Sequence, residues 1–157
     1  MKVLFLVIGK TDERYLEEGL KKYFGRLKHY IGIEMRVIPD LKNRKALGEE
    51  AQKEAEGNLI LATLQAGDSL ILLDENGKQF SSRAFAGFIE KQMIQSTKRL
   101  VFVVGGPFGF AADVYERADK KISLSPMTFS HQIIRLLFAE QLYRAFTIIR
   151  GEPYHHD

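Results

Sequence analysis

Three short, uninterrupted apolar runs constrain the fold of this 157-residue chain more than any other feature. They span Val3–Ile8, Ser69–Leu73 and Leu100–Val104, and a weaker fourth run, Glu34–Ile38, ends at Pro39. Continuous runs of this length, rich in Val, Ile, Leu and Phe, are typical of parallel strands that helices cover on both faces. The sequence therefore predicts an α/β domain built on a mainly parallel sheet.

The segments between these runs show helical periodicity. Glu13–Tyr30 carries apolar residues at spacings of three and four, and Asp12 is its expected N-cap. Further helices are expected over Ala46–Leu64 and Arg83–Ile94, the second entered through a pair of serines. Because strands and helices alternate without a linker or repeat, we expect one domain over residues 1–157, with helices on both faces of the sheet.

The last third of the chain has a different pattern. After the third apolar run we expect, in order, a glycine-rich turn (Gly105–Phe110), a short helix (Ala112–Arg117), a short strand (Lys121–Ser123), a bridge (Leu124–Phe129) and a long helix (Ser130–Ile149). Gly151 follows as the expected stop signal of that helix.

Composition excludes several classes of chemistry. The chain has no cysteine, which excludes disulfides, thiolate zinc sites, iron–sulfur clusters and a cysteine nucleophile. The first apolar run is far too short for a signal sequence or a membrane span of about 20 residues, so we expect a cytoplasmic protein without a membrane partner. A net charge of +3 permits a nucleic-acid partner without requiring one.

Two segments are candidates for ligand binding. The glycines at Gly105–Gly109 follow an apolar strand, where backbone N–H groups can meet a ligand, but taken alone an ordinary tight turn between strand and helix explains them better. The bridge Leu124–Phe129 combines hydroxyls, a methionine and a phenylalanine, which suits an adenosine; the alternative is a plain loop with Ser130 as the cap of the next helix.

Charged residues give weaker signals. Glu140 and Arg144 form an i, i+4 pair in an otherwise apolar helix, where structural pairing is the simpler interpretation. Of two basic clusters, the loop Asp40–Lys45 is the better candidate for phosphate contact. The other cluster alternates with glutamates on a predicted helix, which is typical of a solvated face: Lys21, Lys22, Arg26 and Lys28. His155 and His156 are sequence neighbours without an acidic cluster nearby, so no metal site is predicted.

Taken together, the motifs resemble a known family. The chain contains V-V-G-G-P-x-G, then L-S-x-M-T-x-S-H, then L-Y-R-A and a terminal P-Y-H, in this order. This set resembles the SPOUT methyltransferases, and within them the small bacterial enzymes that methylate N3 of a pseudouridine in ribosomal RNA. The resemblance covers the whole chain and implies a SPOUT fold with a trefoil knot over residues of about 100–157.

The resemblance also implies a cofactor, a substrate and a partner. The cofactor is S-adenosylmethionine, the substrate is a pseudouridine in the helix 69 loop of 23S rRNA in the assembled ribosome, and the protein is a homodimer that pairs through the knot region. The implied cofactor-binding residues are Leu73, Gly105, Leu124, Ser125, Pro126, Met127, Thr128 and Phe129. The implied residues for activity or RNA contact are Glu140, Arg144, Tyr154 and His155.

Two alternatives and two departures accompany this interpretation. The alternatives are a SPOUT methyltransferase that acts on transfer RNA and a non-catalytic RNA-binding or ribosome-assembly factor. Phe108 stands where some relatives carry an acidic residue, and His156 stands where a basic residue is common. Our mechanistic hypothesis is that His155 and Tyr154 orient the target base or take its proton, while Arg144 holds a phosphate.

Overall fold

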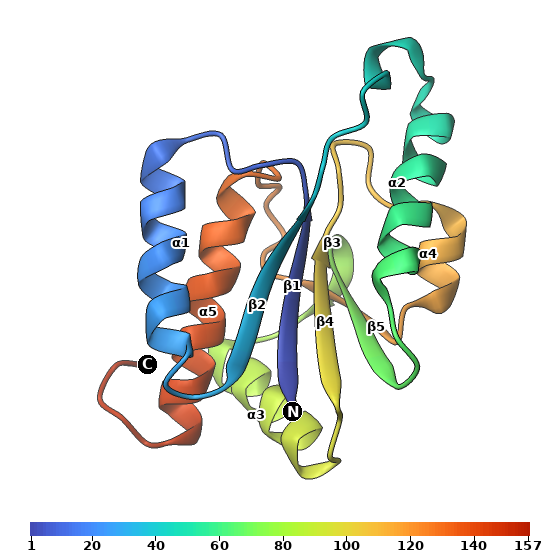
Figure 1. Cartoon of the computed structure of the whole chain (residues 1–157). Helices are drawn as coiled ribbons and strands as arrows, with labels where there is room; N and C mark the ends of the chain where they lie inside the picture. Colours follow the sequence, from blue (N-terminus) through green and yellow to red (C-terminus); the bar gives the residue numbers. More distant parts are fainter.

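Five strands form one parallel sheet in the order β2-β1-β4-β3-β5 in the computed structural model, which describes residues 1–157 (Figure 1). The strands are β1 (Lys2–Ile8), β2 (Gly32–Ile38), β3 (Asp68–Gln79), β4 (Arg99–Val104) and β5 (Lys120–Ser123). The apolar runs of the sequence provide β1, β4 and the first half of β3, which are buried because helices cover both faces. The predicted α/β class and parallel sheet are confirmed.

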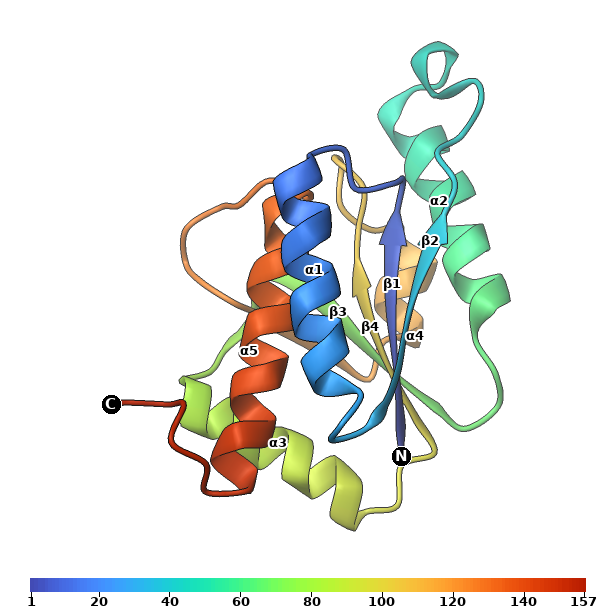
Figure 2. The same ribbon diagram turned by 60° about the vertical axis from the view of Figure 1, so that its left-hand side comes forward.

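Helices cover the sheet in two unequal layers. They are α1 (Arg14–Leu27), α2 (Glu49–Thr63), α3 (Ser82–Ile94), α4 (Ala112–Arg117) and α5 (Ile133–Ile149). Figures 1 and 2 show α1, α3 and α5 on one face and α2 and α4 on the other. The first layer encloses a core of 18 buried residues and the second a core of 12, so the three-helix face carries most of the packing.

Three helix starts differ from the sequence prediction. Asp12 is not the N-cap of α1, because the helix begins at Arg14 and Glu13 occupies the cap position; the N–H of Asp12 donates to Oε1 of Gln132 at 2.9 Å. The start of α2 at Ala46 was wrong, because Arg44–Ala46 forms a separate 3-10 turn. α5 begins three residues after Ser130, whose hydroxyl accepts from the N–H of Ile133.

Other boundaries agree with the sequence signals. α4 spans the predicted residues, and the hydroxyl of Ser81 accepts from the N–H of Ala84 at 3.1 Å, which caps α3. Gly151 has a φ of +67° and its N–H donates to the carbonyl of Ile148 at 3.0 Å, which ends α5 as the sequence indicated.

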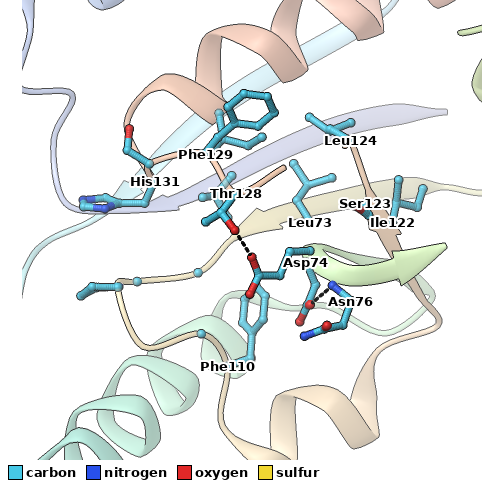
Figure 3. Close-up of a pocket in the computed structure, with 18 of the residues that line it drawn as sticks. Leu73, Asp74, Asn76, Phe110, Ile122, Ser123, Leu124, Thr128, Phe129 and His131 are labelled. Carbon is cyan, nitrogen blue, oxygen red and sulfur yellow. Dashed lines mark hydrogen bonds between the residues drawn. The ribbon is translucent and has the colours of Figure 1, made fainter. Parts of the chain in front are cut away.

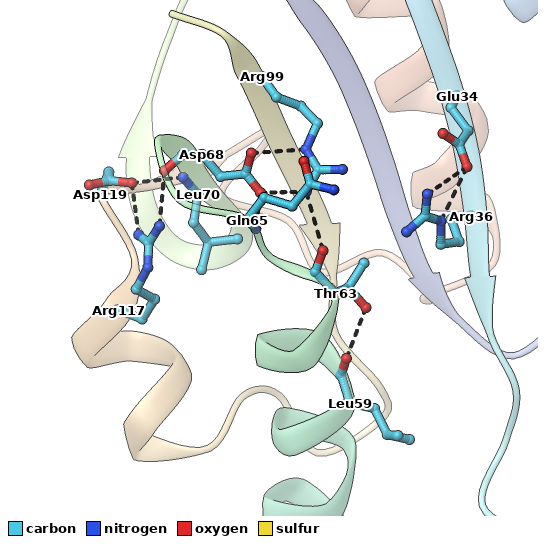
Figure 4. Close-up of polar contacts among 10 residues, drawn as sticks. All are labelled: Glu34, Arg36, Leu59, Thr63, Gln65, Asp68, Leu70, Arg99, Arg117 and Asp119. Carbon is cyan, nitrogen blue, oxygen red and sulfur yellow. Dashed lines mark hydrogen bonds and ion pairs between the residues drawn. The ribbon is translucent and has the colours of Figure 1, made fainter.

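The amino edge of the sheet is closed by polar contacts (Figure 4). Arg99 on β4 donates to both carboxylate oxygens of Asp68 on β3, and Arg117 donates to the backbone carbonyl of Asp68 at 2.9 Å. Although burial opposes ionisation, the hydrogen bond from Arg99 lowers the pKa of Asp68. These polar groups are hydrogen-bonded to one another, so we assign them a structural role at the amino ends of the strands. The candidate site lies at the carboxyl ends.

The chain crosses the carboxyl edge of the sheet after β5. β5 lies at one edge, yet Gln132 and Arg135 at the start of α5 bond to residues at the end of β1, near the opposite side. The connecting segment, residues 124–132, therefore passes over the carboxyl ends of β3 and β4. This is the edge at which parallel α/β sheets bind ligands.

Candidate functional site

A cavity of about 510 Å³ opens at the carboxyl ends of β3, β4 and β5 (Figure 3). Its volume is in the range of small-molecule and cofactor sites. The lining includes seven of the eight residues that the sequence predicted for the cofactor: Leu73, Gly105, Leu124, Ser125, Met127, Thr128 and Phe129. Pro126 is exposed and stands outside the lining.

The three glycines of the turn stand where a side chain would be crowded or strained. The N–H of Gly109 donates to the carbonyl of Gly106 at 3.2 Å, and Gly109 has a φ of +82°. A Cβ on Gly105 would lie 3.1 Å from the ring of Phe110, and a Cβ on Gly106 would lie 2.3 Å from Oε2 of Glu56. The turn therefore lines the cavity with the backbone of its glycines and with the side chains of Pro107, Phe108 and Phe110.

The bridge between β5 and α5 is held in shape by its own hydroxyls. Ser123 donates to the carbonyl of Ser125 at 2.7 Å, and the hydroxyl of Ser125 accepts from the N–H of Met127 at 3.0 Å. Thr128 donates to Oε2 of Glu75 at 2.7 Å, which ties the bridge to the middle of β3. With the polar groups occupied, Met127 and Phe129 remain exposed as apolar contacts, with Met127 71% exposed.

Sequence reasoning missed several residues of the cavity wall. Asp74 and Glu75 follow the apolar half of β3 directly, and Asp74 accepts a hydrogen bond from the hydroxyl of Tyr115. Burial and this hydrogen bond raise the pKa of Tyr115 to about 12, so its phenol stays protonated. Their position directly after the predicted strand Ser69–Leu73 was the signal that would have found Asp74 and Glu75, although β3 itself continues to Gln79. His131 and Ile134 also line the cavity.

A buried carboxyl supports the glycine turn from below. Glu56 on α2 is 5% exposed, and its Oε1 accepts from Nε2 of Gln52 at 2.8 Å. Burial raises the pKa of Glu56 above its ordinary value, because the surrounding apolar core disfavours the charged form. No sequence motif marked Glu56, since a single glutamate on a polar helix is unremarkable before the fold is known.

Glu56→Gln is expected to stabilise the protein in a pH-dependent manner. An acid whose pKa is raised by folding contributes stability that is present below its unfolded value of 4.5 and lost as the pH rises through the folded value. The variant should therefore melt at a higher temperature than wild type at pH 8, with the difference vanishing near pH 4.5. Thermal unfolding across this range tests it, with exposed Glu54→Gln on the same helix as control. A variant less stable than wild type at pH 8 contradicts it.

The four residues predicted for activity or RNA contact lie together. Oε1 of Glu140 accepts from Nε of Arg144 at 3.1 Å and from the hydroxyl of Tyr154 at 3.0 Å. The guanidinium of Arg144 lies 4.8 Å from the ring centre of Tyr154 and contacts Nδ1 of His155 at 3.2 Å. Burial and hydrogen bonds to Tyr23 and Glu140 raise the pKa of Tyr154 far above its ordinary value, so Tyr154 is a donor.

Both ring nitrogens of His155 are engaged in this arrangement. A guanidinium only donates, so Nδ1 of His155 accepts from Arg144, and Nε2 carries the proton that it donates to Asp157 at 2.9 Å. Asp157 in turn accepts from Arg83 on α3. The tail is thus fastened to its own chain, with His155 oriented between a cation and an anion.

The cavity and this tail cluster are separate within one chain. None of Glu140, Arg144, Tyr154 and His155 lines the cavity. Ile134 lines it, and Arg144 lies ten residues further along α5, about 15 Å at the helical rise. The predicted cofactor residues therefore form one group around the cavity, and the predicted activity residues form a second group at a distance from it.

The basic loop before α2, a metal site and a membrane span remain to be considered. Lys42, Arg44 and Lys45 are exposed on the loop before α2, and Arg44 pairs with Asp40 at 3.1 Å. No group of three or more His, Asp or Glu side chains is arranged to hold a metal ion. None of the helices is both long and apolar enough to cross a membrane.

Comparison with known proteins agrees with this geometry. A family model described as "Predicted SPOUT methyltransferase" matches residues 1–155. A protein of Parabacteroides distasonis named "Ribosomal RNA large subunit methyltransferase H" is 60% identical over 157 residues, covering 100% of both chains. A protein of the same name from Christiangramia forsetii is 58% identical and covers 99% of both chains.

One solved structure extends the comparison at the level of fold. "Crystal Structure of Probable Methyltransferase from Bordetella pertussis Tohama I" matches with a TM-score of 0.57 and covers 92% of this chain and 96% of that chain. At 14% sequence identity, the match shows a shared fold alone.

Proposed function

Because the chain belongs to the SPOUT methyltransferase family, we propose that it is an S-adenosylmethionine-dependent methyltransferase of large-subunit ribosomal RNA, acting in the cytoplasm on ribosomes. The observation that carries the proposal is the cavity at the carboxyl edge, because seven residues that the family pattern assigns to the cofactor line it. Full-length relatives that carry the ribosomal methyltransferase name support the substrate class.

The cavity fits the cofactor in shape and charge. Gly105 and Gly106 bring backbone to the cavity wall, and Met127 and Phe129 offer apolar surface for an adenine ring. Asp74 and Glu75 place carboxylates in the wall, which suits a ligand with cationic groups. When bound, S-adenosylmethionine supplies a methyl group on a positively charged sulfur.

The proposed target is N3 of a pseudouridine in the helix 69 loop of 23S rRNA, in the assembled ribosome. The N3 proton must leave before or during attack, so the enzyme has to fix the base in a reactive orientation. Tyr154 and His155 orient that base, Arg144 contacts a phosphate, and Glu140 holds Arg144 and Tyr154 in place. Nδ1 of His155 has to leave Arg144 before it accepts a proton, because Nε2 already carries the hydrogen that it donates to Asp157.

Two copies of the chain complete the site in this proposal. The tail cluster lies away from the cavity of its own chain, and three apolar side chains are exposed at the start of α5 and in the bridge before it: Ile133, Met127 and Phe129. Apolar side chains at the cavity rim favour a second copy that pairs along α5, so that the tail of one chain reaches the cavity of the other. The trefoil knot over residues of about 100–157 belongs to the same proposal, supported by the passage of residues 124–132 across the sheet edge.

Labelled methyl incorporation tests the activity. Wild-type protein with labelled S-adenosylmethionine should label assembled ribosomes and leave transfer RNA unlabelled, and mass spectrometry should identify N3-methylpseudouridine. Label in transfer RNA instead favours a transfer-RNA enzyme. Absence of both methyl transfer and cofactor binding favours a non-catalytic assembly factor.

Mixed dimers test the shared site. Gly106→Val is expected to impair cofactor binding and His155→Ala to impair the tail function, so each variant alone should be inactive at low cofactor concentration. Co-expressed at equal amounts, they should recover about a quarter of wild-type activity, because half the dimers are mixed and each has one intact site. Dimers of two wild-type chains that carry different tags serve as the control. Recovery of no activity contradicts a tail that serves the partner.

A further inference from the structure

A second concave surface lies between the end of α1 and the end of α5. This groove is lined by Arg26, His29, Tyr30, Tyr143, Arg150, Glu152 and Tyr154. The guanidinium of Arg150 lies 4.7 Å from the ring centre of Tyr30, and that of Arg26 lies 5.4 Å from the ring centre of Tyr143. Stacking on aromatic rings fixes the planes of both cations while their N–H groups stay open.

The arginines of this groove differ from all others in the chain. Seven of the ten arginines pair with a carboxylate, and Arg135 donates to backbone carbonyls. Arg26 and Arg150 are the two whose side chains have no hydrogen-bond acceptor in the protein, and both line the same groove. Two oriented guanidiniums without acceptors form a site for an external anion.

The single carboxylate of the groove is already occupied. Glu152 accepts a hydrogen bond from the hydroxyl of Tyr30. This hydrogen bond, together with burial, raises the pKa of Tyr30 to about 12, so the phenol remains a donor to Glu152. Lys22 and Lys28 are exposed on and just after α1 and add to the positive charge nearby. The groove is therefore cationic towards solvent.

The groove is continuous with the tail cluster. Tyr154 lines the groove and donates to Glu140, which also holds Arg144. The rings of Tyr143 and Tyr154 meet edge to face with centres 4.7 Å apart. A polyanion bound by Arg26 and Arg150 would therefore lie next to Tyr154, one of the residues proposed to orient the target base.

We propose that this groove binds the phosphate backbone of ribosomal RNA beside the target nucleotide, with Arg26 and Arg150 as the phosphate contacts. The inference rests on the proposed function and adds to it a docking surface outside the cofactor cavity. Fixed arginine–phosphate contacts of this kind set the register of an RNA without reading its sequence.

Binding to assembled ribosomes at several salt concentrations tests this surface. The Arg26→Gln, Arg150→Gln variant should bind at least about tenfold more weakly at low salt, and the slope of log affinity against log salt should fall by about 1.5, since two phosphate contacts are lost. Its affinity for S-adenosylmethionine by calorimetry and its melting temperature should match wild type. The matched control is Arg14→Gln, Arg36→Gln, which removes the same charge at carboxylate-paired sites and should keep the wild-type slope.

The outcomes separate this inference from the proposed function. Wild-type protein that methylates ribosomes while the groove variant keeps the wild-type salt slope overturns the inference alone. A groove variant that loses its dimer by light scattering but keeps ribosome binding also overturns it and assigns the groove to a protein contact. Wild-type protein that neither binds nor methylates ribosomes overturns both.

Discussion

Arg135→Met is expected to lower the free energy of unfolding by about 3–5 kcal/mol, since it leaves buried acceptors without their donor. The side chain of Arg135 is fully buried, and it donates to the carbonyls of Ile8 at 2.8 Å and Gly9 at 2.9 Å and to that of His131 at 3.0 Å. Burial lowers the pKa of its guanidinium, and no carboxylate pairs with it. Methionine fills much of the same volume but donates no hydrogen bond.

Urea unfolding measures the effect of Arg135→Met. The control is Arg14→Met, whose side chain is 91% exposed, and its effect should stay within about 0.5 kcal/mol of zero. A loss below about 1 kcal/mol for Arg135→Met would show that the backbone at Ile8 and Gly9 finds other donors. The expected loss would show that the hydrogen bonds of Arg135 stabilise the contact between α5 and the end of β1.

Gly106→Val is expected to weaken S-adenosylmethionine binding by about a hundredfold or more, which is about 2.7 kcal/mol. A Cβ at this position would lie 2.3 Å from Oε2 and 2.9 Å from the carboxyl carbon of Glu56. Glu56 is buried in α2 and hydrogen-bonded to Gln52, so the glycine turn has to move towards the cavity instead. The variant should remain folded because the sheet residues are unchanged.

Calorimetry with S-adenosylmethionine checks this prediction. Gly87→Ala on α3 is the control, since a Cβ there has no neighbour within 4 Å, and its cofactor affinity should equal that of wild type. Gly105→Val should have a smaller effect, because its Cβ meets the ring of Phe110 at 3.1 Å instead of a buried carboxyl. Wild-type affinity in Gly106→Val would contradict the placement of the cofactor at this turn.

The central strands were predictable because their burial leaves a direct record in the sequence. β3 shows where that record stops, since it continues to Gln79 through the polar residues Asp74–Lys78 and pairs with β5 across an irregular register. An edge pairing of polar residues has no apolar run to mark it. The predicted start of α2 at Ala46 was wrong for a related reason. Arg44–Ala46 has helical composition but forms only one 3-10 turn, and α2 begins at Glu49.

The site divides in the same way. The glycine turn and the bridge were identifiable because unusual residue types stand in a fixed order. Glu56 was not, since its significance lies in its burial against Gly106, a contact between residues 50 positions apart. The separation of Tyr154 and His155 from the cavity was equally hidden, because sequence order does not show how far α5 carries the tail from the sheet edge.

The bonds from α5 to the end of β1 set an order for maturation. Arg135 and Ile8 are 127 residues apart, so this contact closes only after nearly the whole polypeptide has been made. Until then the segment 124–132 has no anchor at its far end, and the cavity lacks a wall. A nascent chain that ends before Arg135 thus lacks the bonds that hold this wall of the proposed cofactor cavity. We therefore expect cofactor binding only after α5 has been synthesised and has bonded to the end of β1.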